Sequence, residues 1–344
     1  MCGIIGIVGK QPVTERLMDS LKRLEYRGYD SAGVATIEGG KIERRRAQGK
    51  IRALEDRLLN QPLSGNIGIG HTRWATHGAP SERNAHPHTS GRVTLVHNGI
   101  IENFAELKGE LTAQGHSFES DTDTEVIAHL IDRQLSRGDS PVTALKNTLD
   151  QITGAFALAV LIAGEDNMIM GARRGSPLVV GYGVGEMFIG SDALAVGPFT
   201  NRIAYLDEGD FVVIDHDRTQ IFDATGMAVD RPIKIVSAAA ALVEKGNYRH
   251  FMEKEIHEQP ESCQRTLGAY TDALTSRTIP TPGLDFASVD RIQIVACGTA
   301  YYAAQIARYL FERLAGLPTD VEIASEFRYR DPALLTTTLA VAVS

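Results

Sequence analysis

The sequence has few of the features that would tie it to a disulfide scaffold, a membrane or a nucleic acid. Its three cysteines, Cys2, Cys263 and Cys297, are far apart and odd in number, which favours reduced thiols over a disulfide framework or a zinc cluster. No apolar run approaches a membrane span, and the N-terminus lacks the basic stretch of a signal peptide. The net charge of -8 argues against a nucleic-acid-binding face. We therefore expect a cytoplasmic protein with neither membrane nor nucleic-acid partners.

Length and composition indicate a globular protein of two domains. A chain of 344 residues is long for one domain, and 43% hydrophobic with 23% charged residues is typical of globular proteins. The one basic run, Arg44-Arg45-Arg46, is short and precedes an amphipathic helix, so we interpret it as a solvated turn.

Hydrophobic periodicity predicts an α+β first domain and a parallel α/β second domain. The predicted helices of the first domain cover 14–25, 51–59 and 104–114, with two more that start near Glu125 and Ser140. Its predicted strands cover 4–8, 32–37, 67–70, 93–99, 155–162, 167–172, 178–181, 187–190, 202–206, 211–215 and 219–222. Helices between two strand-rich regions predict two packed sheets with the helices outside.

The periodicity changes after an Ala-rich connector. A helix over 248–274, interrupted near Pro260, leads to a strand–turn–helix–strand pattern that starts at Arg291. We expect a first domain over 1–240, a helical linker over 241–280 and a second domain over 281–344. Because Ser344 directly follows a strand, we expect this second domain to be incomplete.

Cys2 is the first candidate for chemistry. If Met1 is removed, one residue carries both a thiol, with a pKa of about 8.5, and an α-amine, with a pKa of about 8, which can act as its base. Taken alone, a penultimate cysteine is more often an ordinary small residue at the start of a buried strand. Gly3, Gly6 and Gly9 do not form a nucleotide-binding loop, because no strand precedes them.

Three further motifs each allow two interpretations. Five histidines between His71 and His97 lack an acidic partner spaced to join them, so hydrogen-bonded histidines are favoured over a metal site. Asn98-Gly99 either turns an amide and a backbone N–H outward or forms a plain hairpin turn. The acids of Asp121–Glu125 either cap a helix or face a ligand amine.

These motifs together resemble the class II glutamine amidotransferases, which are N-terminal-nucleophile hydrolases. The resemblance rests on five ordered segments: Cys2-Gly3-Ile4-Ile5-Gly6, Arg27–Gly33, His71–Gly78, His97-Asn98-Gly99 and Thr122–Glu125. Within that group the glutamine–fructose-6-phosphate aminotransferase family is similar over the whole chain. Its interdomain segment resembles residues 248–256, and the start of its sugar-isomerase (SIS) domain resembles 297–299 and 322–329. The resemblance implies a four-layer αββα sandwich followed by part of a parallel-sheet SIS domain.

The resemblance also implies roles for single residues. Cys2 matches the nucleophile, and Asn98 with the Gly99 N–H matches the oxyanion hole. Arg73 matches the group that holds the α-carboxylate of glutamine, and Asp123 the group that receives its α-ammonium. The other residues implicated at this site are Trp74, Thr76 and His77 in the loop over glutamine, and Arg27, which orients the N-terminal residue.

Substrates and partners follow from the same resemblance. It implies L-glutamine and D-fructose-6-phosphate as substrates, no cofactor or metal, and a homodimer formed through a complete SIS domain. Thr299 matches a sugar-phosphate contact, but Ala300 stands where many relatives carry a serine, which would cost one hydrogen bond to phosphate. We expect this chain alone to hydrolyse glutamine without forming glucosamine-6-phosphate.

Two alternatives stay open at this stage. One is another class II enzyme, such as an amidophosphoribosyltransferase or an asparagine synthetase, which would need a phosphoribosyl-pyrophosphate or ATP motif downstream. The other is a non-catalytic module that senses glutamine through an intact pocket.

Overall fold

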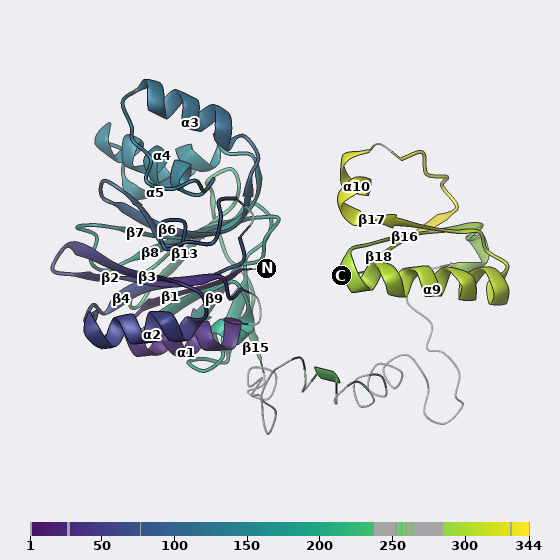
Figure 1. Cartoon of the computed structure of the whole chain (residues 1–344), viewed down its shortest axis with the longest axis horizontal. Coiled ribbons are helices and arrows are strands. Elements are labelled where there is room, and N and C mark those ends of the chain that lie inside the picture. Colours follow the sequence, from purple (N-terminus) through teal and green to yellow (C-terminus); the bar gives the residue numbers. More distant parts are fainter. Residues whose placement is uncertain are drawn as a thin grey trace. The chain divides into compact units, whose positions relative to one another are not determined.

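The computed structural model describes residues 2–25, 28–75, 77–236, 285–330 and 332–343, and between them Met252, Glu255, Ile256, Gln259 and Cys263. The chain divides into two compact units, Met1–Lys254 and Glu255–Ser344 (Figure 1). The expected boundaries near 240 and 281 and most of the expected helix over 248–274 lie outside the described residues. These boundaries therefore stay predictions.

Two antiparallel sheets form the first unit. In spatial order the first sheet contains β15 (Ile233–Ile235), β11 (Arg202–Tyr205), β9 (Val179–Tyr182), β10 (Met187–Gly190), β1 (Gly3–Val8), β4 (Ile67–Arg73), β2 (Ser31–Glu38) and β3 (Lys41–Gln48). The second sheet contains β14 (Ala228–Val229), β13 (Thr219–Phe222), β12 (Phe211–Ile214), β8 (Ile169–Arg174), β7 (Gly154–Ile162), β6 (Val93–Ile101) and β5 (His88–Ser90).

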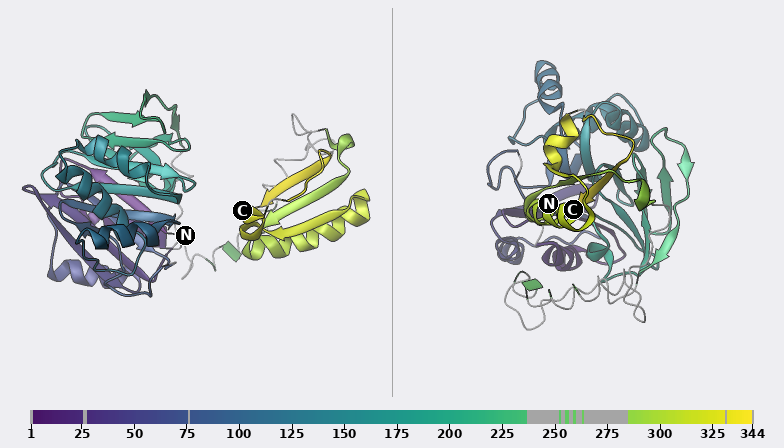
Figure 2. Two further views of the ribbon diagram at one scale, coloured as in Figure 1. Left: turned by 90° about the horizontal axis from the view of Figure 1, so that it is seen from above. Right: turned by 90° about the vertical axis from the view of Figure 1, so that its right-hand side faces the viewer.

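Helices cover the outer face of each sheet. The first sheet carries α1 (Thr14–Leu24), α2 (Ile51–Asn60) and the short α6 (Ala193–Val196), and the second carries α3 (Phe104–Ala113), α4 (Glu125–Ser136) and α5 (Pro141–Leu149). Figure 1 shows the two helix layers on opposite sides of the sheets, and Figure 2 shows the same layers from two further directions. The predicted αββα sandwich is confirmed.

Alternating side chains of β1 explain why two apolar layers meet at this strand. Ile4 and Val8 point into the core between the sheets, while Ile5 and Ile7 point into the core under α1. All four are fully buried, so β1 is fixed from both faces. A strand held in this way gives a rigid base for the residue that precedes it, Cys2.

One local prediction was wrong, and one of two open interpretations is excluded. Arg44-Arg45-Arg46 lies within the edge strand β3 and not in a turn. An edge strand accommodates these charges because each arginine finds an acceptor: Arg44 and Arg45 pair with glutamates at 2.8 Å, and Arg46 donates to the Ala85 carbonyl at 3.1 Å. Asn98-Gly99 forms no hairpin, because β6 continues through both residues to Ile101.

The second unit is a small parallel sheet with helices. Its strands are β17 (Thr319–Ile323), β16 (Arg291–Ala296) and β18 (Thr338–Val343), with β16 in the centre. The 3-10 turn η2 (Phe286–Ser288), α9 (Gly298–Ala315) and α10 (Ala324–Tyr329) complete it. The predicted parallel α/β pattern is confirmed. Among the described residues of both units, none of the helices is long and apolar enough to cross a membrane.

Candidate active site

A pocket of about 320 Å³ opens where β1, β4 and β6 bring segments of both sheets together. Seven of the residues predicted for a site line it: Cys2, Arg73, Trp74, His77, Asn98, Gly99 and Asp123. The structure therefore gathers residues from four of the five motifs around one cavity.

Cys2 lies beside the end of β4 because of the strand register. Gly3 pairs with Thr72, so Cys2 and Arg73 follow side by side. The backbone N–H of Trp74 donates to Cys2 Sγ at 3.1 Å. Burial raises the pKa of the Cys2 thiol above its ordinary value, although the Trp74 N–H and a nearby positive charge oppose the rise. The thiol consequently needs a base before it can act as a nucleophile.

Arg73 lines the pocket and has one guanidinium nitrogen without a hydrogen-bond partner among the described residues. Its Nη2 donates to the carbonyls of His77 and Gly78, the latter at 2.9 Å. Its Nη1 is buried without a hydrogen-bond partner among the described residues, 4.0 Å from Asp30 Oδ1. Burial lowers the pKa of Arg73, which nevertheless remains charged. A buried guanidinium with an unused donor is suited to an anionic ligand group.

The segment Gly28–Ser31 supports the Arg73 backbone. A Cβ on Gly28 would lie 2.6 Å from the carbonyl carbon of Arg73, so only glycine fits there. Asp30 donates its backbone N–H to the Arg73 carbonyl at 3.2 Å, and its carboxylate accepts from the Ala75 N–H. Asp30 thus holds the start of the loop after β4, a role that the sequence did not indicate.

Asn98 and Gly99 lie on β6, in the second sheet, and line the same pocket as Cys2. Asn98 Nδ2 donates to the Cys2 carbonyl oxygen at 3.0 Å. Gly99 has a φ of +125°, and a Cβ there would collide with the carbonyl oxygen of Ala155. The outward turn predicted at these residues is therefore a local distortion within the strand.

Asp123 supplies a carboxylate to the same pocket. It is 3% exposed, and its Oδ2 accepts from the Ile101 N–H at 2.8 Å. The flanking threonines bind histidines: Thr122 Oγ1 lies 3.2 Å from His88 Nε2, and Thr124 Oγ1 lies 2.9 Å from His97 Nδ1. These contacts fix the backbone on both sides of Asp123.

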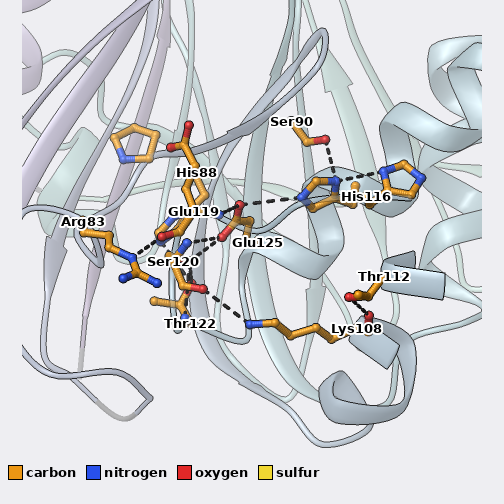
Figure 3. A network of polar contacts seen from close by, with 12 residues as sticks. Arg83, His88, Ser90, Lys108, Thr112, His116, Glu119, Ser120, Thr122 and Glu125 are labelled. Carbon is orange, nitrogen blue, oxygen red and sulfur yellow. Dashed lines mark hydrogen bonds and ion pairs between the residues drawn. The ribbon is translucent and has the colours of Figure 1, made fainter. Parts of the chain in front are cut away.

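Glu125 completes the support of this loop, as Figure 3 shows. Its carboxylate accepts from the N–H groups of Glu119 and Ser120 at 2.7 and 2.6 Å and from the Ser120 hydroxyl at 2.7 Å. His129 Nε2 lies 3.6 Å away. Burial raises the pKa of Glu125, but these hydrogen-bond partners together outweigh burial and lower it to about 2. The helix therefore begins with a buried carboxylate that organises the preceding loop.

Four histidines near the pocket, His71, His86, His88 and His97, are buried and packed together. Burial, the largest cause for each, lowers the pKa of His71, His86, His88 and His97, to about 3 for His71. His86 stacks on His71 with ring centroids 4.1 Å apart. Within the described parts of the chain, no three His, Cys, Asp or Glu side chains are grouped to hold a metal ion.

Three predicted residues are not among the described residues that line the pocket. Arg27 and Thr76 are outside the described residues. Thr299 belongs to the first turn of α9 in the other unit. Three further lining residues, His97, Thr122 and Thr124, belong to the predicted motifs but had no role assigned, and His86 is one of the five histidines noted in the sequence. The remaining lining residues lie outside every motif: Ile100, Ser176, Pro177 and Ser191. Ser191 directly follows β10 and its Oγ accepts from the Ile4 N–H at 3.0 Å, a contact without any signal in the sequence.

The arrangement suits a ligand that carries both charges of an amino acid. A guanidinium and a carboxylate line the pocket together with a thiol, which matches an α-carboxylate, an α-ammonium and an electrophilic side chain. An amide beside the thiol can donate to an oxygen that gains negative charge.

Two domain families match the chain. Residues 71–196 match the glutamine amidotransferase domain, and residues 285–344 match the SIS domain. The isomerizing glutamine–fructose-6-phosphate aminotransferase of Caulobacter vibrioides is 69% identical over the whole chain, and that of Brucella suis is 56% identical. The chain spans 57% of the length of each of these relatives.

Solved structures support the fold. Glutamine phosphoribosylpyrophosphate amidotransferase from B. subtilis is similar over 93% of this chain and 65% of its own, with a TM-score of 0.60 and 21% identity. The allosteric regulatory enzyme of purine biosynthesis gives a TM-score of 0.59 over the same shares. At this identity the likeness concerns the fold alone.

Proposed function

The chain belongs to the glutamine–fructose-6-phosphate aminotransferase family, and on this premise we propose that its pocket hydrolyses L-glutamine to glutamate and ammonia. The main support for the proposal is that Arg73, Asp123 and Cys2 line a single pocket. Arg73 Nη1 is buried and has no hydrogen-bond partner among the described residues. Arg73 and Asp123 fit the charged ends of an amino acid, and the thiol fits its side-chain amide.

The first half of the reaction forms a thioester. With Met1 removed, the α-amine of Cys2 takes the thiol proton, and Sγ bonds to the amide carbon of glutamine. The amide oxygen gains negative charge and receives hydrogen bonds from Asn98 Nδ2 and the Gly99 N–H. The ammonium of Cys2 then returns its proton to the leaving nitrogen, the C–N bond breaks, and ammonia departs.

The second half regenerates the enzyme. A water molecule gives a proton to the α-amine and bonds to the thioester carbon, and the C–S bond breaks as Sγ recovers the proton. Glutamate is released. Since burial raises the pKa of the thiol, the thiol needs the amine as its base in the first half. In the second half the same amine accepts the proton of water.

The gating and orienting roles of the remaining residues are also part of the proposal. Trp74 is 48% exposed at the rim, with its ring 5.3 Å from Tyr29, and His77 packs against Phe104. We assign Trp74, Thr76 and His77 to the loop over glutamine and Arg27 to orienting Cys2, as the resemblance implies.

The SIS unit is the basis for the rest of the function. We propose that, in a protein of the relatives' full length, ammonia passes to D-fructose-6-phosphate to form glucosamine-6-phosphate, with Thr299 in the sugar-phosphate site. The match of residues 285–344 to the SIS domain and the relatives' names support this. A cytoplasmic homodimer without nucleic-acid or membrane partners is proposed on the same grounds.

Release of glutamate from glutamine by this chain tests the proposal. We expect N-terminal sequencing to find Cys2 first and Cys2→Ala to abolish release, with Cys263→Ala, an exposed cysteine, as the matched control that retains it. Retained Met1 together with glutamine binding but no turnover would favour a sensing module. Glutamate release by Cys2→Ala would remove Cys2 from the mechanism.

A further inference from the structure

His71 is a fully buried histidine on β4, two residues before Arg73. Its Nε2 lies 3.0 Å from Asn98 Oδ1 and 3.0 Å from the His97 carbonyl oxygen. The ring of His86 stacks on it from one side. His71 does not itself line the pocket among the described residues, yet it touches the amide that does.

The proton on His71 can be assigned from its neighbours. The Cys2 carbonyl oxygen only accepts, so the Asn98 atom 3.0 Å from it must be the amide nitrogen, Nδ2. Asn98 Oδ1 therefore faces His71. Both groups near His71 Nε2 are then acceptors, and Nε2 must carry the proton that it shares between them.

His71 stays in this tautomer throughout the neutral range. Burial is the main cause that lowers its pKa to about 3, so the ring is neutral and holds one proton. With Oδ1 held by His71 and one Nδ2 hydrogen held by the Cys2 carbonyl, the second Nδ2 hydrogen of Asn98 remains available.

We propose that His71 is a positioning residue: its Nε2–H holds the Asn98 amide in the orientation that directs the second Nδ2–H at the oxygen of the reacting amide. The inference rests on the proposed function, because it assigns a part in the oxyanion hole of that reaction. His71 acts through Asn98 and touches no substrate. A 180° flip of the Asn98 amide would place an oxygen against the oxyanion, and the His71 donor disfavours that flip.

The alternative is that His71 only fills space between the sheets. Any ring of similar size could fill this space, whereas positioning the Asn98 amide requires a hydrogen-bond donor at Nε2. A double-mutant cycle separates these roles, because a residue that acts only through Asn98 has no effect once the Asn98 amide is gone.

The experiment compares His71→Phe and His71→Gln in the parent chain and with Asn98→Ala. We expect His71→Phe to lower kcat for glutamate release on the order of 10- to 100-fold, with KM changed less than about threefold. His71→Gln, which keeps an N–H donor near Nε2, should recover most of this loss. Next to Asn98→Ala, His71→Phe should change kcat by less than about twofold.

His88→Phe is the matched control for loss of a buried histidine. His88 is 1% exposed and bonds Thr122, not Asn98, so its effect should combine additively with Asn98→Ala. If His71→Phe does not fold, by the thermal unfolding transition, His71→Met replaces it as the variant without a donor. The proposal would be overturned if the variant without a donor lowered kcat equally in the parent chain and in Asn98→Ala. It would also be overturned if a folded His71→Gln did not recover kcat.

Failure of the proposed function has a different signature. If the parent chain releases no glutamate, or if Cys2→Ala still releases it, the glutaminase assignment falls and His71 loses its role with it. If the parent chain is active and depends on Cys2, an additive cycle rejects only the role of His71.

Discussion

The side-chain amide of Asn98 donates a 3.0 Å hydrogen bond to the backbone carbonyl of Cys2, across 96 residues of sequence. Cys2 precedes β1 of the first sheet, and Asn98 belongs to β6 of the second. The packing of one sheet on the other therefore sets the distance between the thiol and the amide. The spacing of the proposed nucleophile and its proposed oxyanion donor is therefore set by the sandwich.

Asn98→Ala should lower kcat for glutamate release by about 10²- to 10³-fold, because one oxyanion donor is lost. KM should change little, since the α-carboxylate and α-ammonium contacts remain. Steady-state kinetics with glutamine measures both constants. The matched control is Asn147→Ala on α5, which removes a hydrogen bond to Asp139 and should leave both constants unchanged, because neither residue lines the pocket. An equal rise in KM with unchanged kcat would place Asn98 in ground-state binding instead.

Gly28→Ala should reduce activity through the Arg73 backbone. The added Cβ would lie 2.6 Å from the Arg73 carbonyl carbon, so the start of the loop that carries Trp74 has to move. Even a displacement of about 1 Å can cost on the order of 10²-fold in rate. Glutamate release and the thermal unfolding transition should be measured together.

Gly109→Ala is the matched control for Gly28→Ala. Gly109 lies in α3 with nothing within 4 Å of an added Cβ, so the substitution should stabilise the helix by about 0.5–1 kcal/mol and leave activity unchanged. Full activity of Gly28→Ala would show that the loop tolerates the shift.

The layers of the fold could be predicted because the spacing of apolar residues along the sequence indicates which side chains are buried. β1 alternates between two cores, α1 shows its apolar stripe, and Ser140 caps α5 as expected, with its side chain accepting from the Thr143 N–H. The very short strands β5, β14 and β15 could not be found, because two or three residues do not establish a period. β3 was missed because its arginines bind partners distant in sequence, such as Glu119.

The site was predictable in part, for a related reason. Motifs identified seven of the residues that line the pocket, among them the thiol of Cys2, the charged groups of Arg73 and Asp123, and the amide of Asn98. The supporting contacts were not predictable, because they join positions far apart in sequence: Asp30 with Ala75, His71 with Asn98, and Ser191 with Ile4. Strand pairing within the first sheet brings Asp30 to Ala75 and Ser191 to Ile4, and the packing of the two sheets brings His71 to Asn98.

Arg73→Lys should raise KM for glutamine by about 10- to 100-fold with a smaller effect on kcat. A lysine retains the charge but loses the planar fork that can bind a carboxylate through two hydrogen bonds, worth about 1.5–3 kcal/mol for a charged group. A glutamine analogue with its α-carboxylate replaced by a neutral amide serves as the control substrate. The parent chain should disfavour this analogue, and Arg73→Lys should disfavour it less. Equal penalties in both proteins would show that Arg73 does not hold the carboxylate.

Glu125 should make the free energy of unfolding depend on pH in the acidic range below pH 4.5. Its folded pKa of about 2 is below its ordinary value of 4.5, so its contribution is complete above pH 4.5 and is lost as the pH falls toward 2. A shift of this size corresponds to about 3 kcal/mol. Glu125→Gln removes this contribution, so we expect the difference in unfolding free energy between the parent chain and the variant to be largest at neutral pH. Urea unfolding in steps from about pH 6 to pH 3 measures how this difference shrinks.

At neutral pH Glu125→Gln should also raise KM for glutamine, because Glu125 holds the loop that carries Asp123. Glu106→Gln, at an exposed position in the first turn of α3, is the control that should follow the parent curve. A constant difference between the parent chain and Glu125→Gln over the whole range would mean that the carboxylate charge contributes nothing to holding this loop.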